Sequence, residues 1–196
     1  MKRWHVYGDP PDEVLDELAA VLRDGGVALL PTDTIYGLHA LAADDRAIAR
    51  IKAMKGREED KPFVIIAASV DQLANLGATI PDGIATVWPA PLTAVLACGG
   101  RTIAARIPDL GWLRALLGRT GPLVSTSANL SGEPPIMTPE MLAVDLLNEL
   151  DALLDQGLRE GKASTIVDFT GDTPRLVREG DPVFSQFLRK TLWKGL

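Results

Sequence analysis

The sequence predicts an α/β protein in which helices pack against an open, twisted β-sheet of mixed strand direction. Apolar side chains recur at helical spacing and then in short buried runs, and the two patterns alternate from end to end. Toward the C-terminus several strand-like runs follow one another without a helix between them, which indicates adjacent late strands. No repeat or low-complexity linker interrupts the 196 residues, so residues 1–196 are expected to form one domain.

The first third of the chain predicts two helices, each followed by a buried strand. Residues 11–26 place apolar side chains on one face, begin with a proline and two acids, and end at a glycine pair. Residues 27–31 (VALLP) predict a short buried strand. Residues 44–56 have helical spacing after two aspartates that can cap a helix, and residues 63–68 (FVIIAA) predict the next strand.

The middle third predicts two neighbouring strands between short helices. A short helix is expected to begin near Ser69. Residues 92–98 and 102–107 are apolar runs on either side of a Gly-Gly-Arg turn, which predicts two connected strands. A short helix around Trp112 and a strand at residues 122–125 (PLVS) follow.

The last third predicts strands framed by two helices. The Thr-Pro pair at residues 138–139 suits the N-cap and first turn of a helix. Residues 152–155, 164–169 and 175–178 read as strands, and residues 184–192 carry apolar side chains at the spacing of a final helix.

Composition and charge exclude several classes of protein. The chain has one cysteine, Cys98, and two histidines, His5 and His39, which excludes a disulfide framework and argues against a zinc site of several Cys and His ligands. The uncharged run at residues 83–98 contains two prolines and is too short to cross a bilayer, and no signal peptide is apparent, so a cytoplasmic location without membrane contact is expected. A net charge of −6 argues against broad nucleic-acid binding, but leaves room for a small basic pocket.

Residues 157–164 (GLREGKAS) superficially match the phosphate-binding P-loop pattern. Three residues rather than four separate the two glycines, and an alanine stands between the lysine and the serine. A strand is predicted next, whereas a P-loop needs a helix whose N-terminal amides bind the phosphates. We interpret this stretch as a polar turn between strands.

Polar and cationic side chains gather where predicted strands end. The stretches are PTDTIYGL at 31–38, KGREEDKP at 55–62, TIAARIP at 102–108 and STSANLSG at 125–132. Each has an ordinary interpretation: a capped turn, a solvated loop, a structural salt bridge and a surface turn, respectively. Alternation along the third stretch puts Thr102, Ala104 and Arg106 on one face of the strand, and an inward arginine there suits a carboxylate or phosphate partner.

Groups for acid–base catalysis are scarce. No Ser-His-Asp set, pair of catalytic carboxylates or metal cage is apparent, and we nominate no residue as general acid or base. A site built from the four strand ends would therefore work by positioning substrates and stabilising charge, as phosphoryl and nucleotidyl transfers commonly do.

Taken in order, these stretches together with WPAPLT, STIVDF and PRLVREG resemble the YrdC/TsaC family of threonylcarbamoyl-AMP synthases. The resemblance runs from about residue 25 to residue 180, and KGRxxDKP and SANLSG are its most specific parts. It implies a YrdC/RibB-like fold with a concave, anion-binding face, in the short single-domain form. It further implies synthesis of threonylcarbamoyl-adenylate from L-threonine, CO2 or bicarbonate and ATP, with release of pyrophosphate, for the threonylcarbamoyladenosine modification of tRNA beside the anticodon.

The resemblance also implies roles for individual residues. The expected ATP contacts are Lys55, Arg57, Lys61, Thr102, Ser127, Asn129 and Arg178. The expected threonine contacts are Thr32, Thr34, Arg106, Ser125 and Ser164. No protein ligand for a metal is implied, and Mg2+ is expected to arrive with ATP. A downstream tRNA threonylcarbamoyl-transferase complex is the expected acceptor of the product, and direct tRNA binding is expected to be weak at most.

Two departures from the family pattern and three rival interpretations remain. Ala90 stands where the family has glycine, which predicts a strained or altered turn, and Glu58 stands where proline is common. The rivals are a double-stranded RNA or tRNA-binding module, a paralogue of the same fold without synthase activity, and the carbamoyl-transfer module of a hydrogenase-maturation protein. The third is disfavoured because zinc-finger-like segments are missing, and the second because the KGR and SAN signatures are present.

Overall fold

The computed structural model describes residues 1–56, 62–130 and 132–192. Within these residues the strands are β1 (Lys2–His5), β2 (Ala28–Pro31), β3 (Tyr36–Leu41), β4 (Val64–Ile66), β5 (Leu92–Cys98), β6 (Arg101–Arg106), β7 (Leu123–Ser127), β8 (Ala152–Asp155), β9 (Thr165–Asp168) and β10 (Arg175–Arg178). The helices are α1 (Asp12–Arg23), α2 (Asp45–Met54), α3 (Val70–Asn75), α4 (Asp82–Ala85), α5 (Gly111–Thr120), a 3-10 turn at Pro139–Met141, α6 (Val144–Asn148) and α7 (Pro182–Leu192).

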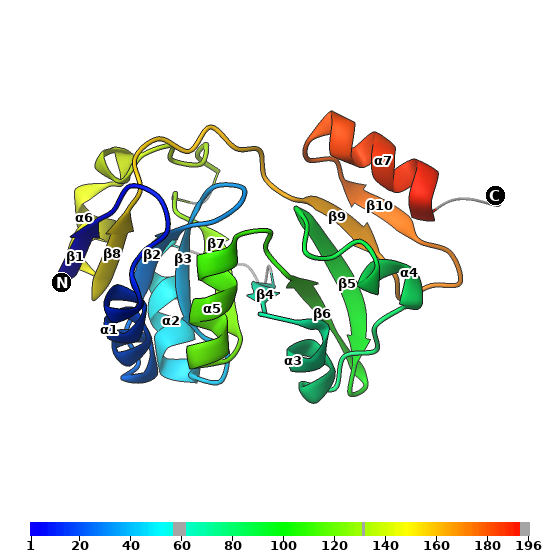
Figure 1. Cartoon of the computed structure of the whole chain (residues 1–196), viewed down its shortest axis with the longest axis horizontal. Coiled ribbons are helices and arrows are strands. Elements are labelled where there is room, and N and C mark those ends of the chain that lie inside the picture. The colour runs from blue at the N-terminus through cyan, green and yellow to red at the C-terminus, as the bar shows by residue number, and fades with distance from the viewer. Residues whose placement is uncertain (57–61, 131, 193–196) are drawn as a thin grey trace.

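All ten described strands form one open, mixed sheet, which confirms the predicted fold class (Figure 1). Their order across the sheet is β1-β8-β2-β3-β7-β4-β6-β5-β9-β10. Four neighbouring pairs are parallel, namely β1 with β8, β8 with β2, β4 with β6, and β5 with β9, and the remaining pairs are antiparallel. Chain segments far apart in the sequence therefore lie side by side.

Local sequence explains where several helices begin and end. The Asp44 carboxylate accepts hydrogen bonds from the backbone N–H groups of Arg46 and Ala47, so it caps α2. The Ser69 hydroxyl accepts from the backbone of Gln72 and begins α3 in the same way. Helix α1 has acids in its first turn and an arginine in its last, both favourable for the helix dipole.

The structure differs from the predicted elements at five points. The strands β1 and β3 and the short helix α4 were not expected. The single helix expected after residues 138–139 is a 3-10 turn followed by α6, because the chain turns to extended conformation at Leu142. Strand β8 is not adjacent to β9, since it pairs in parallel with β1 and β2 at the other end of the sheet.

Helices cover both faces of the sheet around β2, and the alternation of side chains along that strand explains why. Ala28 and Leu30 pack in one core with α1 and α5, while Leu29 points to the opposite face and packs with α2 and α6. All three side chains are fully buried. Burial of one leucine contributes about 1.5–3 kcal/mol relative to leaving it exposed.

The other half of the sheet has helices over one face. Ile103 and Ala105 of β6 pack in a core with side chains of α3, α4 and α7. Ala104 and Arg106 of the same strand point to the opposite face, where they line a cavity. Residues 156–164 leave β8, run across the molecule to β9 (Figure 1) and contribute to the wall of that cavity. We call residues 156–164 the crossover segment.

The turn at residues 88–91 does not show the predicted strain. Among the described residues every residue with positive φ is a glycine, so Ala90 adopts an ordinary backbone conformation. The backbone N–H of Ala90 donates to the carbonyl of Ile107 at 3.1 Å, and the indole of Trp88 donates to the carbonyl of Leu92 at 2.9 Å. The other departure, Glu58, lies outside the described residues.

The helices of the described ranges are all too short or too polar to cross a lipid bilayer.

Candidate functional site

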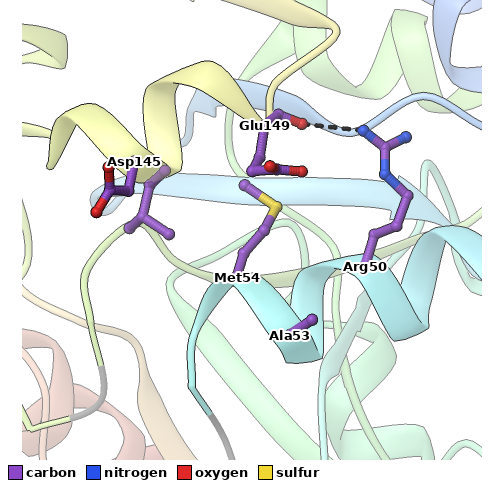
Figure 2. Close-up of a pocket in the computed structure, with 6 residues that line it drawn as sticks. Arg50, Ala53, Met54, Asp145 and Glu149 are labelled. Carbon is purple, nitrogen blue, oxygen red and sulfur yellow. Dashed lines mark hydrogen bonds between the residues drawn. The ribbon is translucent and has the colours of Figure 1, made fainter.

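The smaller of two prominent cavities among the described residues lies between α2 and α6 (Figure 2). Its volume is about 380 Å3, and it is lined in part by Arg50, Met54 and Glu149. The Arg50 guanidinium already donates to the Asp151 carboxylate and to the Glu149 carbonyl, each at 2.9 Å. Because this charge is paired within the protein, the smaller cavity offers no free cation to a ligand.

The larger cavity has a volume of about 600 Å3 and contains most of the residues predicted from the sequence. The predicted residues that line it are Thr32, Thr34, Arg106, Ser125, Ser127, Asn129, Ser164 and Arg178. They come from the turn between β2 and β3, from β6, from β7 and the loop after it, from the crossover segment and from β10. The fold therefore gathers four distant strand ends into one site.

The turn between β2 and β3 forms one wall of the cavity. The Thr32 hydroxyl accepts from the backbone N–H groups of Thr34 and Ile35, donates to the Ile35 carbonyl at 2.8 Å and lies 2.9 Å from the Thr34 hydroxyl. A single side chain thus fixes the whole turn. Thr32 is largely occupied in this role, whereas Thr34 presents its hydroxyl to Arg106.

Arg106 is a buried cation on the cavity wall. Its guanidinium donates to the Thr34 hydroxyl at 2.8 Å and lies 3.4 Å from the Asp33 carboxylate. Burial lowers the pKa of Arg106, and the charge of Asp33 partly opposes that effect. The Nε atom is buried without a hydrogen-bond partner among the described residues. Asp33 was missed by the sequence analysis, although its position between two threonines of the motif could have drawn attention to it.

Arg178 supplies a second cation from β10. Its guanidinium donates to the Ser164 carbonyl at 2.8 and 3.1 Å, and the Ser164 hydroxyl lies 2.8 Å from that of Thr93. Burial and the positive charge of Arg106 lower the pKa of Arg178. No carboxylate of the described residues lies within ion-pair distance of Arg178. Two guanidinium groups thus share one cavity, an arrangement that favours an anionic ligand.

Glu133 is the single carboxylate among the described residues that line the cavity. It follows the SAN motif in the loop after β7, and the sequence analysis did not identify it. The cavity therefore combines two cations, several hydroxyl groups and one anion. Such a set can bind a zwitterion with its carboxylate toward the arginines and its ammonium group toward the glutamate.

Ser125 lies on the cavity wall in front of a buried histidine. Its hydroxyl is 3.1 Å from Nε2 of His39, which is fully buried on β3. Burial, together with the charge of Arg106, lowers the pKa of His39 to about 3. The imidazole is therefore neutral at physiological pH.

Two predicted contacts do not line the cavity, and two lie outside the described residues. Lys55 is buried and donates to the carbonyls of Ser127 and Asn129, so it supports the loop after β7 from behind. Thr102 is exposed, beyond Ala104 on the same face of β6. Arg57 and Lys61 belong to the range that the structure does not describe, and their predicted phosphate contacts stay predictions.

Asn129 shapes the loop that follows β7. Its amide nitrogen donates to the carbonyls of Leu130 and Glu133. Its amide oxygen lies 3.4 Å from the Lys55 ammonium group. These bonds hold the backbone of Leu130 and Glu133 close to Asn129, and Glu133 lines the cavity.

The stretch with P-loop character is part of the crossover segment and packs against the first wall of the cavity. No helix follows it; β9 begins at Thr165, as the interpretation of a polar connection predicts. Gly161 lies so close to the turn before β3 that a Cβ atom there would be 1.6 Å from the carbonyl oxygen of Thr34. Only glycine allows this approach of the two backbones.

We expect His39 to make the stability of the protein depend on pH. Its pKa is about 3 in the native state and about 6.5 when unfolded, so between these values the unfolded chain binds a proton that the native protein does not. Stability is then lost as the pH falls through this window, by about 2 kcal/mol between pH 7 and pH 5. Urea unfolding at both pH values measures the loss.

The matched control for this prediction is His39→Gln, which cannot titrate. The difference in unfolding free energy between pH 7 and pH 5 should be about 2 kcal/mol smaller in the variant than in the unsubstituted protein. Equal differences in the two proteins would show that His39 does not titrate as the structure implies.

Comparisons with known proteins agree with this geometry. The family model Sua5/YciO/YrdC, described as telomere recombination, matches residues 20–180. The chain is 35% identical to the threonylcarbamoyl-AMP synthase of Bacillus subtilis over 91% of its own length and 58% of that protein. It is 36% identical to the enzyme of the same name from Chromohalobacter salexigens over 84% of its own length and 97% of that protein.

Among solved structures, the chain is similar to P. abyssi Sua5 complexed with L-threonine. The TM-score is 0.88 with 32% sequence identity, and the match covers 98% of this chain and 61% of that one. The chain thus spans about three fifths of two of these proteins and nearly all of the third.

Proposed function

Because this chain belongs to the Sua5/YciO/YrdC family, we propose that it synthesises threonylcarbamoyl-AMP from L-threonine, CO2 or bicarbonate, and ATP. The observation that carries the proposal is the cavity lined by the guanidinium groups of Arg106 and Arg178 and by three side chains with hydroxyl groups, Thr34, Ser125 and Ser164. The similarity to a protein that binds L-threonine supports threonine as the amino acid.

The proposed reaction has two bond-forming steps. The ammonium group of L-threonine loses a proton to solvent, the resulting amine attacks the carbon of CO2, and loss of a second proton from the nitrogen gives the carbamate. An oxygen of the carbamate then attacks the α-phosphorus of ATP, and the bond from that phosphorus to the bridging oxygen breaks, so pyrophosphate leaves. Both reactants are anions, so the protein must hold like charges together and neutralise the charge of the departing group.

We assign Arg106 to the threonine carboxylate because its buried guanidinium is fixed by Thr34 and Asp33. Its unpartnered Nε–H suits a carboxylate oxygen. Arg178 is assigned to ATP, as are Ser127 and Asn129. We assign no proton-transfer step to a side chain.

Mg2+ is expected to enter bound to the triphosphate. The described residues hold no group of three or more His, Cys, Asp or Glu side chains that could bind a metal ion. The ion would screen the charge of the phosphates. The residue assignments above do not depend on it.

The experiment that tests the proposal is a pyrophosphate-release assay. Purified protein with ATP, Mg2+ and bicarbonate should release pyrophosphate only when L-threonine is added, and mass spectrometry should detect threonylcarbamoyl-AMP. L-Valine, which has nearly the shape of threonine but no hydroxyl group, is the matched control and should support little release. Release that ignores threonine, or no release, would overturn the proposal.

The alternative to synthase activity is that the protein is a double-stranded RNA or tRNA-binding module. Binding of tRNA with a steep salt dependence and no turnover of ATP would favour it. The net charge of −6 argues against it. We further propose that a tRNA threonylcarbamoyl-transferase consumes the product, since an acyl-phosphate mixed anhydride is an activated group donor.

A further inference from the structure

His39 lies directly behind a residue of the proposed amino-acid site. It pairs with Ser125 across β3 and β7, so the two side chains stand on the same face of the sheet. Nε2 of the imidazole is 3.1 Å from the Ser125 hydroxyl oxygen. His39 is fully buried, whereas Ser125 lines the cavity. The imidazole can therefore reach a ligand only through Ser125.

The backbone of β3 holds the imidazole ring in place. A Cβ atom on Gly37 would be 2.9 Å from Cε1 of His39, so the ring occupies space that any other residue at position 37 would fill. The second ring nitrogen, Nδ1, is buried, and the backbone of Gly37 and Ala28 acts on the ring and partly offsets the lowering of its pKa. The contact with Ser125 is the hydrogen bond that the ring makes to another side chain among the described residues.

A serine hydroxyl on a cavity wall can rotate among three staggered positions. The fixed imidazole behind Ser125 selects one of these positions for the hydroxyl oxygen, whether Nε2 of His39 or the hydroxyl group carries the proton of the hydrogen bond. The ligand then meets a preset hydroxyl and does not bear the cost of ordering it. Since the imidazole is uncharged, it adds orientation to the cavity without adding a cation.

We propose that His39 is a positioning residue for amino-acid binding and acts only through the Ser125 hydroxyl. The inference rests on the proposed function, because it takes Ser125 as a contact of the amino-acid substrate. It goes beyond that function in assigning a role to a buried side chain that touches no ligand. His39 should influence the affinity for L-threonine and leave the affinity for ATP unchanged.

A double-mutant cycle with His39→Leu and Ser125→Ala tests the proposal. Leucine fills the space but offers no hydrogen bond, and each single variant should weaken binding of L-threonine by about five- to tenfold. In the Ser125→Ala background, His39→Leu should cause no further loss. Calorimetric titration with L-threonine, and separately with an ATP analogue, measures the affinity of each of the four proteins for these ligands without requiring turnover.

The conservative control is His39→Gln. The glutamine amide can donate or accept, so this variant should retain affinity for L-threonine within about twofold. Thermal unfolding of all variants checks that the cavity is intact. A variant whose affinity falls equally for threonine and the ATP analogue would indicate general damage and overturn the specific role.

The outcomes separate this inference from the proposed function. If the unsubstituted protein binds L-threonine but His39→Leu binds it equally well, the role of His39 is overturned and the function stands. Losses that add in the double variant also overturn the role, since His39 would then act by a route other than Ser125. If the unsubstituted protein does not bind L-threonine, both proposals fail.

Discussion

Replacing Arg106 by methionine should lower kcat/KM for L-threonine by about 10²- to 10⁴-fold. The estimate takes two charge-assisted hydrogen bonds to a carboxylate at about 1.5–3 kcal/mol each. Methionine keeps much of the length of arginine but has no donor. Pyrophosphate release at varied L-threonine concentration measures the effect, and unchanged efficiency would contradict the assignment of Arg106 to the carboxylate.

The same substitution should also destabilise the protein, and a second change separates the two effects. Asp33 is only 7% exposed and loses its ion-pair partner when Arg106 is replaced. We expect a loss of about 1–3 kcal/mol in the free energy of unfolding, because a buried carboxylate is left unpaired. Adding Asp33→Asn should restore much of this stability and none of the activity. Recovery of activity in the double variant would mean that Arg106 serves only to neutralise Asp33.

Gly161→Ala should reduce kcat/KM for L-threonine by about 100-fold. The new Cβ atom would lie 1.6 Å from the Thr34 carbonyl oxygen, so the crossover segment or the turn that carries Thr34 must move by more than an ångström. The φ angle of Gly161 is outside the left-handed region, so the effect is a collision of backbones and not a strained backbone. The pyrophosphate assay again measures the change.

Gly157→Ala is the matched control in the same segment. Gly157 has a φ of 72°, so alanine there strains the backbone, but the added Cβ meets no atom within 4 Å. This variant should lose some stability and retain most of its activity. If both variants were fully active, the close approach at Gly161 would be irrelevant to the site.

Much of the fold could be predicted because local patterns fixed it. The run at residues 92–98 is wholly uncharged and ends at two glycines, and β5 occupies the same residues. Strands β1 and β3 were missed for opposite reasons. Strand β1 has the sequence KRWH, without the strict alternation of apolar and polar side chains that indicates a strand, and it lies at the edge of the sheet, where it pairs with β8. Strand β3 begins inside the stretch at residues 31–38, which was interpreted as a capped turn, so its apolar residues were not assigned to a strand.

Eight of the twelve predicted contacts line the larger cavity. Six of them lie in the stretches that the sequence places at strand ends, whereas Ser164 and Arg178 were assigned only by the family resemblance. The role of Lys55 could not be predicted from its position at a helix end. A lysine there can face a ligand or turn inward, and the carbonyls of Ser127 and Asn129, more than 70 residues away, decide which. Asp33 and Glu133 were missed because isolated acids are common in polar turns.

The walls of the larger cavity come from the turn before β3, from β6, from β10 and from the crossover segment. Bringing these walls together requires contacts between segments separated by 70 residues or more, such as Tyr36 with Gly157 and Thr34 with Arg106. A ligand that contacts several walls therefore stabilises the folded arrangement of all of these segments, because the walls cannot separate without releasing it. Its binding energy adds to the free energy of global unfolding, and amide protons in both halves of the sheet would exchange more slowly together.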